Sequence, residues 1–166
     1  MEEESKRAGE SALTFDPGLL PDATVAFIGH LSTPWQKGHC PKNLTEARNR
    51  GGPFHAHVTE AYRGGLAGLS VGMTVILLYW MGSARRDLIL QAPAHKPAPT
   101  GTFALRSPAR PNPIALAVVR LVAIDAAAGV LTIDACDAFD GTPLIDIKPW
   151  LPGVDIPPDH PTGCAA

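Results

Sequence analysis

Short apolar or alternating segments, separated by turn residues, make up the middle of the chain. The run 73–80 is almost continuously apolar, whereas 143–148 alternates apolar and polar side chains. Alternation is typical of a half-buried strand, and a short apolar run is typical of a strand buried on both faces. We therefore predict strands at residues 23–31, 55–62, 73–80, 102–105, 116–124, 130–135 and 143–148.

Turn and helix signals complete this pattern. Residues 125–129 separate two of the predicted strands and end in Gly129, which can adopt a positive φ, so we predict a hairpin there. Asn43, with Glu46 three residues later, favours a short helix over 43–49. The chain also has 17 prolines and 16 glycines. We expect a mainly β fold: a single-domain β-barrel formed from a folded mixed sheet, with a few short helices.

Length and composition limit the possible organisation. A chain of 166 residues fits one domain, predicted at 23–155, with a flexible N-terminal tail at 1–22 and a C-terminal tail at 156–166. A net charge of −2 excludes a global basic field for nucleic acid. Three cysteines provide no disulfide framework, which fits the cytoplasm. The acidic N-terminus is not a signal peptide, and the apolar run 75–81 is too short to span a membrane.

Several general site types find little support. His55 and His57 would share one face of a strand and could hold a metal, but two half-buried imidazoles are the alternative and we expect no metal. The glycines within 64–68 miss the dinucleotide-binding spacing. Ser107 lies in no glycine elbow, and we expect Cys136 to be a buried apolar residue rather than a nucleophile.

Two proline-braced stretches of opposite charge are stronger candidates. In RSPARPNP, three prolines stiffen the chain around Arg106 and Arg110, whose planar donor groups suit carboxylates, phosphates or bases. The alternative is a rigid loop whose arginines pair with aspartates. In DAFDGTP, Asp137 and Asp140 flank an Asp-Gly turn and could face a cation or cap the turn. A pocket between the two stretches would suit a ligand that carries both charges.

The same stretches resemble a known family. FALRSPARPNPIALAVVRL and DAFDGTPLIDIKPWLPGVD closely resemble the TsaA-like family, also called YaeB-like or TrmO-like, and the similarity includes FIGHLSTP and CPKN. The resemblance implies a cytoplasmic, homodimeric β-barrel methyltransferase that uses S-adenosylmethionine. The expected partner is tRNA, methylated on N6 of threonylcarbamoyladenosine next to the anticodon, and no membrane is involved.

The resemblance also implies roles for individual residues. Leu116 and Phe139 would cover the adenine of the cofactor, and backbone groups at 138–140 would contact its edge. Asp137 or Asp140 would face its cationic part, and Asp140 is the candidate catalytic base. The full set of cofactor-binding residues that the resemblance implies is Pro41, Lys42, Asn43, Gly82, Ser83, Arg106, Leu116, Asp137, Ala138, Phe139 and Asp140.

The chain departs from the family pattern at several of these positions. Gly82 stands where many members have histidine, Lys42 and Asn43 replace Arg and Gln, and Ala115 and Ala117 replace Gly and Ser. The chain is also expected to lack the C-terminal domain of longer bacterial members. Two alternatives therefore stay open: a methyltransferase acting on another RNA or a small molecule, and an S-adenosylmethionine-binding module without catalysis.

Overall fold

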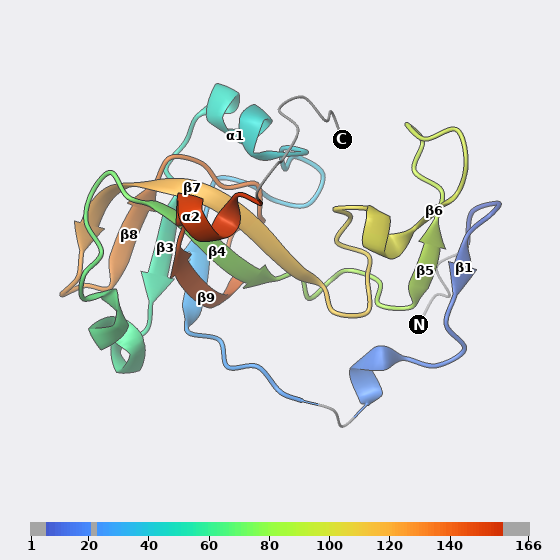
Figure 1. Cartoon of the computed structure of the whole chain (residues 1–166), viewed down its shortest axis with the longest axis horizontal. Coiled ribbons are helices and arrows are strands. Elements are labelled where there is room, and N and C mark those ends of the chain that lie inside the picture. Colours follow the sequence, from blue (N-terminus) through green and yellow to red (C-terminus); the bar gives the residue numbers. More distant parts are fainter. Residues whose placement is uncertain (1–5, 21–22, 158–166) are drawn as a thin grey trace. The chain divides into compact units, whose positions relative to one another are not determined.

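The computed structural model describes residues 6–20 and 23–157. They belong to two compact units: Met1–Val25 with Trp80–Ala115, and Ala26–Tyr79 with Leu116–Ala166. The prediction of a mainly β chain with a few short helices is confirmed (Figure 1). Parts of the expected tails, at 1–5, 21–22 and 158–166, lie outside the described residues.

The larger sheet is a closed barrel with the strand order β2-β3-β8-β7-β4-β9. Strand β9 pairs antiparallel with both β2 and β4, which closes the ring of hydrogen bonds. Along β4, alternate side chains are buried, as expected for a strand with one face towards a core. The strands are β2 (Gly29–Ser32), β3 (His55–Val58), β4 (Thr74–Trp80), β7 (Ile114–Asp125), β8 (Val130–Ile133) and β9 (Pro143–Pro149).

Most barrel strands match the sequence prediction. The apolar runs at 73–80, 116–124, 130–135 and 143–148 correspond to β4, β7, β8 and β9. The predicted hairpin is the antiparallel β7–β8 pair, and Gly129 has a φ of 74°. Strand β2 begins only at Gly29, and residues 23–28 form no strand, although the Ile28 amide donates to the Leu144 carbonyl at 2.8 Å. Strand β3 ends at Val58 and is followed by the 3-10 helix η2 (Glu60–Leu66).

A second, three-stranded sheet belongs to the other unit. Its order is β1-β5-β6, formed by β1 (Ser11–Ala12), β5 (Leu88–Gln91) and β6 (Thr100–Gly101). Strand β1 and the 3-10 helix η1 (Pro17–Leu19) fall within the segment expected to be an N-terminal tail.

The predicted strand at 102–105 is wrong, because the chain there forms the 3-10 helix η3 (Thr102–Ala104). The cause is the buried side chain of Thr102. Its hydroxyl donates to the Leu88 carbonyl at 2.8 Å and accepts from Gln91 Nε2 at 2.9 Å. These bonds hold the Thr102 side chain in the interior of this unit. The alternation of apolar residues alone had predicted an extended segment here.

The short helix predicted after Asn43 is confirmed as α1 (Leu44–Arg50). The Asn43 side chain accepts a hydrogen bond from the Glu46 amide at 2.9 Å, which satisfies one of the free donors of the first turn. Gly51 ends the helix with a φ of 66°. A second helix, α2 (Pro152–Asp155), follows β9. Within the described ranges, no helix is long and apolar enough to cross a membrane.

A histidine cluster lies on β2 and β3. His30 is opposite His57 in the strand register, and their rings stack at 4.7 Å between centroids. His55 meets His57 edge-on at 6.0 Å, and its Nδ1 lies 3.3 Å from the Thr132 hydroxyl. Among the described residues, no group of three or more potential ligands is arranged to hold a metal ion.

We expect this cluster to make stability depend on pH. Burial, followed by the neighbouring His30 and His55, lowers the pKa of His57, while Asp140 opposes the shift. The unfolded chain therefore binds this proton more readily, and stability should fall as the pH drops below the usual histidine pKa. The loss of melting temperature between pH 8 and pH 5 should be smaller in His57→Gln than in the wild type. His95→Gln, on an exposed loop, is the control, and equal losses in all three proteins would contradict the prediction.

Candidate functional site

Two segments far apart in the sequence are joined by hydrogen bonds at one place in the larger unit. The Thr33 hydroxyl donates to the Ala138 carbonyl at 2.9 Å, and Trp35 Nε1 donates to the Cys136 carbonyl at 2.7 Å. The Thr33 amide donates to Asp140 Oδ1 at 3.0 Å, and the Asp140 amide donates to the Trp35 carbonyl at 2.8 Å. The segment 31–41 therefore fixes the loop 136–141, which contains both candidate carboxylates.

Asp137 is held at both ends. Its Oδ1 accepts from the Tyr79 hydroxyl at 2.9 Å, and its carbonyl accepts from the Cys40 thiol at 3.0 Å. Two residues after Asp137, the Phe139 carbonyl accepts a hydrogen bond from the Thr142 hydroxyl at 2.7 Å. Each carbonyl from 136 to 139 thus accepts a hydrogen bond from a side chain. The backbone oxygens at 138 and 139 are among the groups at 138–140 that were expected to contact a ligand. In the structure they accept hydrogen bonds that order the loop.

The donors around Asp137 stay protonated at neutral pH. Burial, with Asp137 as the second cause, raises the pKa of Tyr79 far above its usual value, and Tyr79 is only 3% exposed. The same two causes raise the pKa of Cys40 to about 11. Burial raises the pKa of Cys136 to about 12, and this side chain is 1% exposed, as expected for a buried apolar residue rather than a nucleophile.

The side chain of Trp35 anchors this arrangement. The Arg50 guanidinium lies 4.3 Å above its ring, and Phe54 packs against it at 5.9 Å between ring centroids. Arg50 also donates to the His39 carbonyl at 2.8 Å. An aromatic side chain that contacts both a guanidinium and a second ring has little freedom, so the indole N–H is directed at the 136–141 loop.

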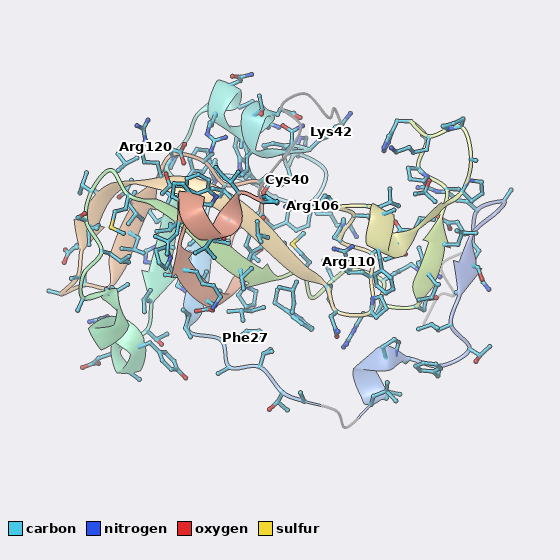
Figure 2. The ribbon with its side chains drawn as sticks, viewed as in Figure 1. Phe27, Cys40, Lys42, Arg106, Arg110 and Arg120 are labelled. Atoms are coloured by element: carbon cyan, nitrogen blue, oxygen red, sulfur yellow. The ribbon has the colours of Figure 1, made fainter. Side chains whose placement is uncertain are left out.

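The candidate residues Pro41, Lys42 and Asn43 lie between this anchor and α1. Pro41 is buried, and Lys42 is exposed with its backbone amide donating to Glu46 Oε2 at 3.1 Å. Asn43 is occupied as the helix cap. Figure 2 shows Cys40 and Lys42 on the segment that leads into α1. The structure therefore brings 41–43 into the segment that is bonded to 136–141 (Figure 2).

Leu116 and Phe139 contribute apolar surface in the same unit. Leu116 is 41% exposed on β7, where its neighbour Ala117 faces the core. Phe139 is half-buried between the two carboxylates of its loop. Asp140 is exposed, and its Oδ1 bond to the Thr33 amide fixes its orientation.

Gly82 and Ser83 belong to the smaller unit. They are exposed in a turn that follows β4, where the Ala84 amide donates to the Met81 carbonyl at 2.9 Å. A Cβ added at Gly82 would lie 3.1 Å from the ring of Trp80. A larger side chain here would therefore require a small shift of the Trp80 ring.

Arg106 and Arg110 lie on the proline-rich loop of that unit (Figure 2). Arg110 donates to the carbonyls of Thr102 at 3.0 Å and Leu105 at 2.8 Å. Gln91 Nε2 donates to the Ala109 carbonyl at 2.6 Å. Arg110 therefore braces the loop through backbone carbonyls rather than through the aspartates that the rigid-loop alternative expected. Arg106 is exposed.

Four residues of the larger unit were given no role from the sequence: Thr33, Trp35, Cys40 and Tyr79. Three of them fall within or beside the family-like segments FIGHLSTP and CPKN, but their side chains act on the loop rather than on a ligand. For Tyr79 the signal was available: a hydroxyl at an inward position of an apolar strand needs a buried partner.

Comparison with known families decides the relationship. The family model described as the tRNA-methyltransferase O N-terminal domain matches residues 30–156. The chain belongs to this family. The match covers both proline-braced stretches and the segment 31–41. The earlier interpretation of these motifs as TsaA-like, or TrmO-like, is confirmed.

Individual members of the tRNA-methyltransferase O family show the same similarity. A probable S-adenosyl-L-methionine-binding protein of Archaeoglobus fulgidus is 40% identical over 119 residues, which are 69% of this chain and 32% of the relative. A tRNA (adenine(37)-N6)-methyltransferase of Mus musculus is 40% identical over 145 residues, 87% of this chain and 32% of the relative. The chain therefore spans about a third of the length of both relatives.

A solved structure agrees. The crystal structure of TrmO from Pseudomonas aeruginosa superposes with a TM-score of 0.65 at 28% identity. The superposition covers 87% of this chain and 63% of the other. The fold shared with that structure thus extends over most of the chain.

Proposed function

We propose that this chain is an S-adenosylmethionine-dependent methyltransferase that modifies N6 of threonylcarbamoyladenosine next to the anticodon of tRNA. Membership of the tRNA-methyltransferase O family supports the reaction class. The name of the mouse relative, a tRNA (adenine(37)-N6)-methyltransferase, supports the acceptor. The observation that carries the proposal is the loop 136–141, where side chains bind four successive carbonyls and present two carboxylates.

The residues fit the chemistry of the cofactor. S-adenosylmethionine carries a sulfonium and an ammonium group, which favour carboxylates, and an adenine, which favours apolar cover. Asp137 and Asp140 supply the carboxylates, and Phe139 with Leu116 supplies apolar surface. When bound, the cofactor supplies an electrophilic methyl group. Among the residues that the family resemblance implies, those of the larger unit that we propose to hold it are Pro41, Lys42, Asn43, Leu116, Asp137, Ala138, Phe139 and Asp140.

The protein contributes mainly by positioning. Methyl transfer from the sulfonium to the ureido nitrogen N6 would be a displacement, in which the new N–C bond forms as the S–C bond breaks and the neutral thioether leaves. Its barrier falls when the reactants are held in line. The hydrogen bonds from Thr33, Trp35 and Cys40 fix the loop before any ligand arrives, so little conformational entropy is lost on binding. With the cofactor bound, Asp137 would orient its positive charge, and Asp140 would accept the proton that the attacking nitrogen loses.

The proposed role of Asp140 gives a direct prediction. Asp140→Asn keeps an oxygen for the Thr33 amide but removes the basic group, so kcat should fall about 100-fold or more, and the affinity for S-adenosylmethionine should fall as well because one carboxylate that faces the cofactor loses its charge. Radiolabelled methyl transfer to tRNA at saturating cofactor measures kcat. The matched control is Asp146→Asn, which weakens a surface ion pair with Lys148 and keeps an oxygen for the Ile147 amide. An unchanged kcat in Asp140→Asn would remove Asp140 as the base.

The proposal includes a homodimer in the cytoplasm. The family resemblance supports both, and light scattering of the purified chain measures the assembly. A monomer at the concentrations used in activity assays would contradict the dimer.

Two measurements test the activity itself. Isothermal titration should detect binding of S-adenosylmethionine and of its demethylated product. Incubation with tRNA that carries threonylcarbamoyladenosine, followed by nuclease digestion and mass spectrometry, should detect the N6-methylated nucleoside. Absence of cofactor binding at millimolar concentration would overturn the proposal. Binding without methyl transfer to any tRNA would instead favour a binding module.

A further inference from the structure

Tyr79 is the one inward-facing residue of β4 that carries a hydroxyl. The side chains of Val75, Leu77 and Tyr79 alternate along the buried face of this strand. A buried hydroxyl without a partner would cost about 1–3 kcal/mol, so its partner is an informative contact. That partner is Asp137 Oδ1, at 2.9 Å, from a loop 58 positions away in the sequence. A side chain of β4 is therefore hydrogen-bonded to the candidate cofactor-binding loop.

The contact fixes the carboxylate group in particular. Cys40 binds the carbonyl of Asp137 and sets its backbone, while Tyr79 binds one carboxylate oxygen and sets its side-chain torsions. The bond to Oδ1 occupies one oxygen, and Oδ2 remains the oxygen that can face a cation. The result is a charged group with its orientation set in advance.

We propose that Tyr79 is a positioning residue of the cofactor site, which acts through Asp137 to hold its carboxylate directed at the positively charged part of S-adenosylmethionine. The inference rests on the proposed function, in which Asp137 binds the cofactor. Tyr79 is outside the residues that the family resemblance implies, and its hydroxyl need not touch the ligand. A purely structural role, in which Tyr79 only fills the core, is the alternative.

Tyr79→Phe removes the hydroxyl and keeps the ring. We expect the Kd for S-adenosylmethionine, measured by isothermal titration, to rise about tenfold, because the lost bond is to a charged group. The chain has two tyrosines, and the other is a matched control. Tyr62 is 43% exposed on η2, and Tyr62→Phe should leave the Kd unchanged. Equal Kd values for wild type and Tyr79→Phe would overturn the inference.

A double-mutant cycle separates positioning from packing. Asp137→Asn should weaken binding at least as much as Tyr79→Phe. If Tyr79 acts through Asp137, the double variant should bind no more weakly than Asp137→Asn alone. If the losses of binding free energy in the two single variants add in full in the double variant, Tyr79 has an independent structural role and the inference is overturned.

A measurement in a chain with an intact Tyr79 avoids any folding defect. In Tyr62→Phe, Tyr79 is the sole tyrosine, so incorporation of 3-fluorotyrosine gives a single ¹⁹F resonance. That resonance should shift on titration with S-adenosylmethionine, since Asp137 gains a cationic partner. A resonance that stays unchanged at saturation would contradict the inference. If the wild type bound no cofactor, the proposed function would fail; if it bound and these tests were negative, only the role of Tyr79 would fail.

Discussion

Replacing Gly29 with alanine is expected to remove much of the folding stability of the larger unit. Gly29 pairs with Val58 on one side and Leu144 on the other, so β2 cannot shift away from either neighbour. A Cβ at this position would overlap the carbonyl oxygen of His57. The ladder must break to relieve the overlap, and we expect a loss of about 3 kcal/mol or more, a large share of a typical total.

Denaturant unfolding followed by circular dichroism measures this loss as a lower midpoint. Gly64→Ala is the matched control, because a Cβ there meets nothing within 4 Å and the residue lies in η2 of the same unit. Its midpoint should differ little from that of the wild type. A Gly29→Ala midpoint as high as that of Gly64→Ala would show that β2 can move, contrary to the pairing described above.

Truncation of Trp35 is expected to have the second large effect, on both stability and cofactor affinity. Trp35→Ala removes the ring that packs on Phe54 and beneath Arg50, together with the bond to the Cys136 carbonyl. Loss of a buried aromatic side chain of this kind costs about 3–5 kcal/mol. Trp35→Phe keeps much of the packing and removes the N–H donor. The buried Cys136 carbonyl then loses this hydrogen bond, which costs about 1–3 kcal/mol.

The two variants separate folding from binding. In Trp35→Phe the chain should remain folded by circular dichroism, while its Kd for S-adenosylmethionine rises about tenfold because the 136–141 loop loses a bond. Trp150→Phe, at a half-buried position after β9, is the control and should keep the wild-type Kd. A wild-type Kd in Trp35→Phe would mean that the loop does not depend on this bond.

The sequence predicted those parts of the fold where one local signal acts alone. The apolar run at 73–80, Gly129 in the hairpin and the Asn43 cap each specify their structure through short-range geometry, and each was confirmed. The predictions failed where hydrogen bonds to residues distant in the sequence determine the local conformation. Thr102 looked like part of a strand, but its bonds to Leu88 and Gln91 turn the chain into a 3-10 helix.

The candidate site shows the same division. Family-like motifs indicated Asp137 and Asp140, and placed the segment 41–43 with them. They could not indicate which groups hold the loop, because those bonds come from β4 and from the segment before α1. The role of Arg110 was likewise left open between bracing and binding, until its bonds to two carbonyls of its own loop resolved it.

The bonds that order the 136–141 loop connect residues 97 to 107 positions apart. During synthesis on the ribosome, Thr33, Trp35 and Cys40 emerge long before their acceptors do. Until most of the barrel strands have been synthesised, these donors lack their acceptors and are exposed to water or to chaperones. A chain interrupted before Asp140 would keep most of its strands and have no ordered site. The candidate site can thus be ordered only after most of the barrel strands have been synthesised.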